Sequence, residues 1–246
     1  MIKNKILLNT SSLFFNMNII FIEARANLSV RMNKKALEFI RKMPNKIGII
    51  TTVQHVHKID ELKEQLEKIG KEVFSEKGNL TKYESQILGC DISAALKIKD
   101  NVDFYLYVGT GRFHPKEVFL KTEKPVVIYN PYSKNISTIN QQEIEIEKNK
   151  RKTGVLKFLY SKKIGILVST KIGQKKIDTA FKLKEMIEKK GKKAFVLLFE
   201  TLDFSQLENF NFIECFVNTA CPRLIEDYDR FPKPVLNAEE IIDLLE

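Results

Sequence analysis

Apolar residues recur along the chain in alternating extended and helical patterns, which predict strands and helices in turn. Residues 46–52 (KIGIITT) form an unbroken run rich in β-branched residues, typical of a strand buried on both faces. Apolar residues at helical spacing then cover 59–69, and Gly70 stands where a C-terminal helix cap is expected. A strand from 104 runs into a glycine loop that ends at 111. The remaining predicted elements are helices at 33–43, 92–98 and 143–160 and extended segments at 72–74 and 125–129.

The second half of the chain repeats this pattern. Four blocks recur in the same order: 162–170 repeats 45–52, 185–196 repeats 64–74, 214–224 falls where 104–115 did, and 233–240 repeats 124–131. We therefore predict an α/β fold of two tandem repeated β-α-β domains with mostly parallel sheets. The predicted domains span 33–142 and 143–246, and the second includes the connecting helix. Right-handed crossovers should expose the carboxyl edges of both sheets in equivalent places.

The start of the chain predicts no domain of its own. Residues 18–23 suit a short strand, but nothing before them is long enough to complete a sheet, so 1–32 is interpreted as the remnant of a further domain. Residues 1–22 resemble a secretory signal in having Lys3 and Lys5 ahead of apolar residues. Polar residues interrupt the apolar run and no small-residue cleavage site follows, so we expect a cytoplasmic protein. No apolar run is long enough to predict a membrane span.

Composition narrows the function classes only a little. The apolar fraction of 43% is ordinary for a globular protein, and the net charge of +10 is spread along the sequence. A basic surface suits acidic partners, but there is no RNA-binding motif with stacking aromatics. The densest basic run, 148–152, reads as a solvated helix face, so direct nucleic-acid binding is not expected.

Three cysteines are an odd number, which argues against a disulfide framework and leaves thiolate or metal chemistry. Pro222 cannot donate to a sheet ladder, so the apolar strand from Ile213 must stop at or just before Cys221. That puts one thiol at the carboxyl end of a strand, the edge where ligands bind in parallel α/β sheets. A lone cysteine there can also be a packed apolar residue. Cys215 lies inside the same strand, where packing is the expected role, and Cys90 follows a glycine in an apolar turn.

All three histidines follow predicted strands. If residues 51–57 are extended, His55 and His57 point to one side, where they could serve a metal or a phosphate-like group, but such pairs also occur in loops by chance. His114 follows the glycine loop that contains Gly109 and Gly111, whose backbone amides can approach a ligand closely. Glycines after a strand can equally mark a simple turn.

Four blocks together, TTVQHVH (51–57), SQILGCD (85–91), GTGRFHP (109–115) and NTACPRL (218–224), resemble the archaeal diphthamide-synthesis enzymes, the 2-(3-amino-3-carboxypropyl)histidine synthases. The resemblance covers roughly residues 18–246. It implies three similar α/β domains, each giving one cysteine to a shared 4Fe-4S cluster that leaves one iron open for S-adenosylmethionine. It also implies radical transfer of the amino-carboxypropyl group to a histidine of elongation factor 2.

Carried onto this sequence, the resemblance assigns the second-domain cluster ligand to Cys90 and the third-domain ligand to Cys221. It places a further set of residues near the adenosylmethionine or the incoming histidine: Gln54, His55, Gly109, Gly111, His114 and Arg223. Arg223 could clamp the methionine carboxylate with two hydrogen bonds, or it could simply pair on the surface with Glu226 or Asp227.

The sequence departs from the family in one respect. The first domain and its cysteine are missing, and residues 18–32 resemble only the last segment of that domain. We therefore expect a separate polypeptide to supply the first domain, in a homodimer or a mixed assembly that acts on elongation factor 2. Three alternatives stay open: a non-catalytic supporting subunit of the same machinery, a quinolinate-synthase-like iron-sulfur lyase, and a folded but non-functional fragment.

Overall fold

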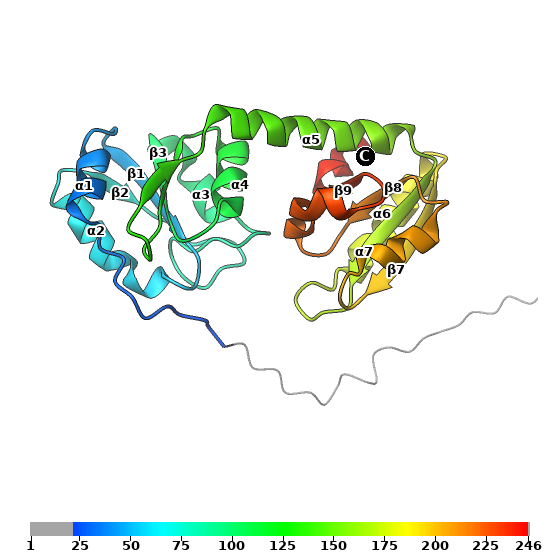
Figure 1. Cartoon of the computed structure of the whole chain (residues 1–246), viewed down its shortest axis with the longest axis horizontal. Coiled ribbons are helices and arrows are strands. Elements are labelled where there is room, and N and C mark those ends of the chain that lie inside the picture. Colours follow the sequence, from blue (N-terminus) through cyan, green and yellow to red (C-terminus); the bar gives the residue numbers. More distant parts are fainter. Residues whose placement is uncertain (1–21, 246) are drawn as a thin grey trace, which may run out of the picture.

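The computed structural model describes residues 22–245, which form two α/β lobes joined by one long helix, α5 (Gln141–Tyr160) (Figure 1). Each lobe is built on its own sheet, with strand orders β2-β1-β3-β4-β5 and β7-β6-β8-β9. All neighbouring strands pair in parallel except β4 and β5. The predicted α/β class with two mostly parallel sheets is confirmed.

The first lobe contains strands β1 (Lys46–Thr51), β2 (Glu72–Phe74), β3 (Phe104–Val108), β4 (Val126–Tyr129) and β5 (Ile136–Thr138), with helices α1 (Lys34–Arg41), α2 (Ile59–Glu67), α3 (Ser93–Lys97) and α4 (Phe113–Thr122). Strand β5 was not predicted, because it is three residues long with two exposed positions and therefore leaves no hydrophobic pattern. Of the strand predicted at 18–23, only Ile22 and Glu23 lie in the described part, and they are not in a strand.

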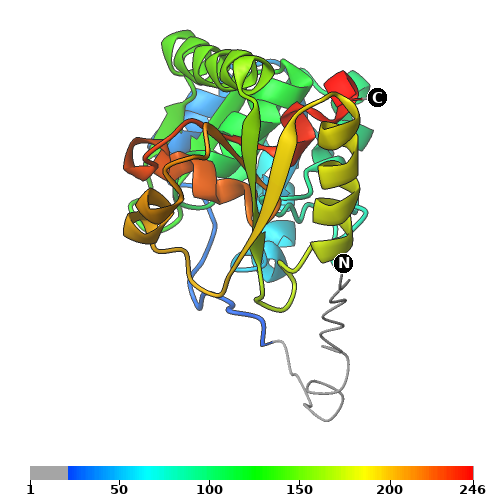
Figure 2. The ribbon, with the colours of Figure 1, turned by 90° about the vertical axis from the view of Figure 1, so that its right-hand side faces the viewer.

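The second lobe contains β6 (Lys163–Ser169), β7 (Lys193–Phe199), β8 (Cys215–Asn218) and β9 (Val235–Asn237), with helices α6 (Ile177–Lys189), α7 (Phe204–Leu207) and α8 (Ile242–Leu245) and the 3-10 helices η4 (Pro222–Arg230) and η5 (Ala238–Glu240). Figure 2 views this lobe from its β7 edge, with α6 on one side of the sheet and α7 with η4 on the other. No helix within residues 22–245 is long and apolar enough to span a bilayer.

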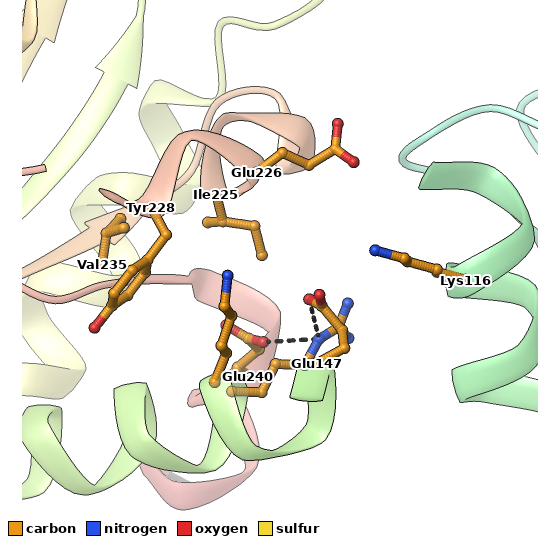
Figure 3. A pocket seen from close by; sticks show the side chains of 9 residues that line it. Lys116, Glu147, Ile225, Glu226, Tyr228, Val235 and Glu240 are labelled. Atoms are coloured by element: carbon orange, nitrogen blue, oxygen red, sulfur yellow. Dashed lines mark ion pairs between the residues drawn. The ribbon is translucent and has the colours of Figure 1, made fainter. Parts of the chain in front are cut away.

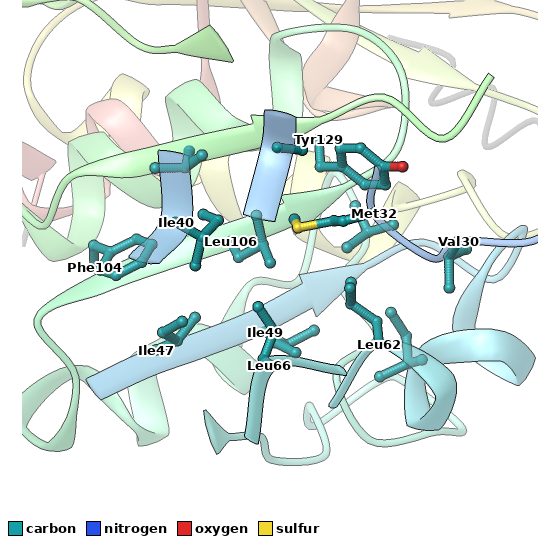
Figure 4. Packing of buried hydrophobic residues seen from close by; sticks show 14 residues of the cluster. Val30, Met32, Ile40, Ile47, Ile49, Leu62, Leu66, Phe104, Leu106 and Tyr129 are labelled. Carbon is teal, nitrogen blue, oxygen red and sulfur yellow. The ribbon is translucent and has the colours of Figure 1, made fainter. Parts of the chain in front are cut away.

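The core of the first lobe follows directly from the sequence pattern. Ile47 and Ile49 of β1 pack against α1 and α2 residues such as Ile40, Leu62 and Leu66, all fully buried (Figure 4). The neighbouring residue of β1, Ile50, faces the opposite layer formed by α3 and α4. A strand that is covered on both faces needs apolar residues at consecutive positions, which is the pattern in the sequence.

The repeat between the lobes extends to single glycines. Gly48 pairs with Tyr105 across β1 and β3, and Gly165 pairs with Phe216 across β6 and β8. A Cβ added at Gly48 would lie 2.7 Å from the Tyr105 ring, and one at Gly165 would lie 2.8 Å from the Phe216 ring. In both lobes the glycine therefore makes room for an aromatic ring on the neighbouring strand.

A lysine after the second helix of each lobe is also repeated. Lys71 follows Gly70 and donates to the carbonyls of Arg41, Met43 and Pro44 at 2.5–3.3 Å. In the second lobe, Lys192 follows Gly191 and donates to three carbonyls at 2.6–3.2 Å that end α5, those of Phe158, Leu159 and Ser161. Each lysine donates to carbonyls at or just after the end of a helix, α1 in the first lobe and α5 in the second, so the two helices correspond in the repeat.

Candidate functional site

Cys90 lies at the tip of a short turn beside the carboxyl end of β1. The Thr51 amide donates to Ser85 at 2.7 Å and the Ile87 amide donates back to Thr51 at 2.8 Å, which holds the segment next to the strand. Leu88 and Asp91 then exchange backbone hydrogen bonds, so Gly89 and Cys90 form the turn. The Cys90 side chain is exposed and free. The turn therefore presents its thiol at the carboxyl edge of the first sheet.

Gly89 connects this turn to a small aromatic group. A Cβ at Gly89 would lie 2.8 Å from the Phe113 ring, so only glycine allows the turn to approach it this closely. Phe113 packs edge-on against His114, with ring centroids 5.3 Å apart, and His114 stacks on Tyr107 at 5.9 Å. Tyr107 belongs to β3 and His114 to the start of α4, so the loop with Gly109 and Gly111 runs over this group. Gly111 needs glycine for its backbone angle of φ +78°.

Cys221 lies at the carboxyl edge of the second sheet, in the loop after β8, the strand that corresponds to β3 of the first lobe. Strand β8 ends at Asn218, and Pro222 begins η4, so the strand stops before the cysteine as predicted. The Asn218 side chain donates to the Cys221 carbonyl at 2.9 Å and accepts from the Ala220 amide at 3.0 Å, which fixes the loop. The Cys221 side chain is half-buried and borders a hollow of about 390 Å³ that Arg223 and Phe199 also line.

Electrostatic coupling links the two edges. Burial, assisted by the positive charge of Arg223, lowers the pKa of His114 to about 4. Burial raises the pKa of Tyr107 to about 12, against the opposing effect of the same Arg223 charge. Arg223 follows Cys221 by two residues, whereas both affected groups belong to the first lobe. Lys116 of α4 and Glu226 of η4 also line one hollow, so α4, whose Phe113 packs on the Cys90 turn, and η4, which follows Cys221, approach each other between the lobes. His114 is neutral at physiological pH.

Arg223 makes the surface ion pair that was one of its two expected roles. Its Nε donates to Glu226 Oε2 at 2.9 Å, and 68% of its side chain is exposed. An exposed pair of this kind is worth less than about 1 kcal/mol, so an incoming carboxylate can replace Glu226 at little cost.

The expectation for His55 and His57 was wrong. Residues 56–58 form a 3-10 helix rather than an extended segment, so His55 is fully buried while His57 is exposed. The two rings therefore do not point to one side. Both ring nitrogens of His55 lack a hydrogen-bond partner, and burial lowers its pKa, with a smaller effect from His57. The ring lies edge-on to Tyr132 at 5.8 Å, away from the Phe113–His114–Tyr107 group.

Gln54 is the other residue predicted from this block. Its side chain is exposed, and its carbonyl accepts from the Ala26 amide at 2.8 Å, which ties the early segment to the end of β1. Thr52 and Ser85 flank the same strand end, and each has a buried hydroxyl without a hydrogen-bond partner. Of the predicted residues, Cys90, Gly109, Gly111 and His114 lie around the Phe113–His114–Tyr107 group of the first lobe. Cys221 and Arg223 line the hollow of the second lobe, and Gln54 and His55 lie beside Ala26 and Tyr132.

Sequence reasoning missed four residues that shape the site: Tyr107, Phe113, Asn218 and Asn237. Asn218 Nδ2 also donates to Asn237 Oδ1 at 2.8 Å, at the carboxyl ends of neighbouring strands. A signal for the asparagines existed, because both occupy strand ends within the repeated blocks 214–224 and 233–240.

The fold and the site define a class of protein with repeated α/β lobes and free thiols at the carboxyl ends of parallel strands. Comparison with known families gives one described as "putative diphthamide synthesis protein", matched over residues 5–246. The chain therefore belongs to the diphthamide synthesis family.

Named relatives agree with this. The 2-(3-amino-3-carboxypropyl)histidine synthase of Pyrococcus horikoshii is 35% identical over 92% of this chain and 65% of its own length. The synthase of the same name from Methanocaldococcus jannaschii is 35% identical over 63% of this chain and 45% of its own length. The synthase subunit 1 of Yarrowia lipolytica is 27% identical over 92% of this chain and 50% of its own length. The chain thus spans less than two thirds of the length of these relatives.

A solved structure, Dph2 from Pyrococcus horikoshii with a 4Fe-4S cluster, superposes with a TM-score of 0.78 at 34% identity, covering 90% of this chain and 63% of that one. The thiols of this chain fit part of such a site. Cys90 and Cys221 are free and reachable, and thiolates are the soft ligands that iron-sulfur clusters use. Cys215 does not fit, because it is fully buried and burial raises its pKa to about 12. Within residues 22–245, no group of three His, Cys, Asp or Glu side chains is arranged to hold a metal ion.

Proposed function

We propose that this chain takes part in the first step of diphthamide synthesis, the transfer of the 3-amino-3-carboxypropyl group from S-adenosylmethionine to a histidine of elongation factor 2. One observation carries the proposal: the two reachable thiols, Cys90 and Cys221, stand at the carboxyl edges of the two parallel sheets. The proposal places the activity in the cytoplasm, where translation takes place.

In this proposal Cys90 and Cys221 are two of three ligands of a 4Fe-4S cluster. When bound, such a cluster supplies one electron to the sulfonium of S-adenosylmethionine, and the carbon–sulfur bond on the amino-carboxypropyl side breaks. Overall, one carbon–carbon bond forms at the imidazole, methylthioadenosine leaves and the ring carbon gives up one proton, so the transfer consumes no net electrons.

The remaining residues hold the co-substrate and the incoming histidine. Arg223 exchanges Glu226 for the methionine carboxylate, because both carboxylates suit the same guanidinium. Neutral His114 offers a hydrogen-bonding nitrogen without adding charge beside a sulfonium. Gly109 and Gly111 let the loop after β3 approach the ligand closely. Gln54 and His55 complete the proposed set: the exposed Gln54 offers its side-chain amide from the loop after β1, and the buried His55 contributes only by packing.

The third thiolate comes from outside these 246 residues. Cys215 cannot serve, since its thiol is packed in the core of the second lobe. We assign the third ligand to a separate polypeptide that carries the family's first domain, in a homodimeric or mixed assembly. The fungal relatives are named as subunits, which is consistent with a multi-chain arrangement.

The direct test uses the assembly purified anaerobically from its native cells, with whatever chains accompany this one. We expect a labelled amino-carboxypropyl group to pass from S-adenosylmethionine to a histidine of elongation factor 2. Serine at Cys90 or Cys221 should abolish transfer, whereas Cys215→Ala, the matched control, should retain it. An assembly with a filled cluster that transfers no label would contradict the proposed reaction.

A supporting, non-catalytic role is the second candidate, favoured by the name "subunit 1" of the fungal relatives. The Cys90→Ala variant separates the two roles in the same assay. Unchanged turnover of S-adenosylmethionine in the complete assembly would favour the supporting role, since a cluster ligand cannot be removed without loss.

A further inference from the structure

The helix that joins the lobes carries a buried arginine at its middle. Arg151 forms ion pairs with three carboxylates from three different elements: Glu117 of α4, Glu147 of α5 itself and Glu240 of η5. The four side chains are only 13–23% exposed. Figure 3 shows Glu147 and Glu240 beside α5, with the ion pair of each to Arg151 dashed, and Lys116 of α4 across the hollow between the lobes.

Polar contacts of Glu240 connect Arg151 with the loop that carries Cys221. One carboxylate oxygen faces Arg151 at 3.5 Å, and the other accepts from the Asn237 amide at 2.8 Å in a capping box. Asn237 accepts from Asn218 at 2.8 Å and donates to the Pro222 carbonyl at 3.4 Å. Asn218 in turn holds the Cys221 carbonyl. An unbroken series of polar contacts therefore runs from Arg151 to the loop that carries Cys221.

The ion pair with Glu117 connects Arg151 with the first lobe. It belongs to α4, the helix that begins with Phe113 and His114, and Phe113 is the ring on which the Cys90 turn packs. Arg112, just before α4, makes a second tie to α5 through Glu143 at 2.6 and 2.9 Å. The first-lobe edge is thus fixed to α5 at two points, and the second-lobe edge is fixed to the same helix through Glu240.

The three carboxylates around Arg151 need a positive charge between them. Three carboxylates face one another around a single cation, and burial together with the charges of Glu117 and Glu147 raises the pKa of Glu240 against the opposing effect of Arg151. Lys116, Lys150 and Glu226 complete the charged lining of the same hollow. Without Arg151, the carboxylates would repel one another and could no longer join α4, α5 and η5.

We propose that Arg151 is a positioning residue that fixes the strand ends bearing Cys90 and Cys221 relative to each other. Relative motion is the default expectation for two lobes joined by one linker, and the ion pairs of Arg151 oppose it because they tie α4 of one lobe and η5 of the other to the same helix. The distance between Cys90 and Cys221 can be measured whatever the protein does. That a fixed distance helps to bind a cluster rests on the proposed function.

The test therefore measures spacing on the apo chain, where a failure of the proposed function has no effect. Spin labels on Cys90 and Cys221 report their distance by pulsed electron paramagnetic resonance, and the buried Cys215 is replaced by alanine throughout. We expect a single narrow distance in this background and its loss in Arg151→Gln. Arg151→Lys, which keeps the charge, should restore most of it, and Lys150→Gln, one residue away on α5, is the matched control and should not change it.

A second variant covers the case in which Arg151→Gln does not fold. Glu117→Gln removes the tie of Arg151 to α4, leaves Arg151 paired with Glu147 and Glu240, and leaves the separate Arg112–Glu143 pair in place, so folding should survive while the distance distribution broadens. Circular dichroism confirms that each variant is folded. A single narrow distance in the folded Glu117→Gln variant would overturn the proposal, as would an unchanged distance in folded Arg151→Gln.

Discussion

At the residue scale, the pKa of His114 depends on a charge from the other lobe, that of Arg223. The folded-state pKa of about 4 lies below the ordinary value of 6.5, with burial as the main cause and Arg223 as the second. The neutral ring therefore stabilises the fold fully above about pH 6.5, and this contribution is lost as the pH falls toward 4. We expect NMR titration to place the midpoint of His114 well below 6.5.

Substitution of Arg223 tests the same geometry. Arg223→Gln removes a positive charge, so the pKa of His114 should rise but stay below 6.5, because burial remains. Arg230→Gln is the matched control, since Arg230 belongs to the same 3-10 helix but lies over the Phe204 ring. An equal midpoint in wild type and Arg223→Gln would mean that the two edges do not face each other in solution.

The positions of some single residues could be predicted from the sequence, and those of others could not. Cys221 could be placed at a strand end because Pro222 marks where pairing must stop. His55 could not be placed, because whether residues 56–58 turn or extend depends on packing at the end of β1, and no local pattern encodes it. The role of Arg151 was equally hidden, since its three partners lie on separate elements.

At the scale of elements, the glycine in the first strand of each lobe controls how closely neighbouring strands pack. Gly165→Ala would place a Cβ 2.8 Å from Phe216 and Ile213 atoms, and we expect it to cost about 1–3 kcal/mol of unfolding free energy. Gly154→Ala is the matched control, because this glycine lies within α5 and its added Cβ would meet nothing closer than 3.5 Å.

Urea unfolding followed by circular dichroism measures both changes. Alanine in the interior of a helix gains up to about 1 kcal/mol over glycine, so Gly154→Ala should be neutral or stabilising while Gly165→Ala destabilises. Equal stability of the two variants would show that the aromatic contact at Gly165 does not limit the sheet.

The hydrophobic pattern predicted nearly all strands, but short β5 could not be found, because its position depends on pairing with β4 rather than on burial.

At the scale of the whole molecule, two lobes whose parallel strands follow the same order each contribute one reachable thiol, and α5 joins the lobes. The repeat in the sequence predicted the equivalence of the lobes. It could not predict their relative placement, which depends on contacts such as Arg112 with Glu143 that no periodicity encodes. The central claim is that Cys90 and Cys221 are two ligands of a three-thiolate cluster site.

Anaerobic reconstitution with iron and sulfide in thiol-free buffer, followed by desalting and Mössbauer spectroscopy, tests this claim most directly. We predict that the chain alone loses its cluster on desalting, because two thiolates leave one ligand position unfilled, and that the chain with its first-domain partner retains a 4Fe-4S cluster. Serine at Cys90 or Cys221 should prevent retention in the complex, whereas Cys215→Ala should not. A stable 4Fe-4S cluster on this chain alone, or one that survives loss of both Cys90 and Cys221, would contradict the account.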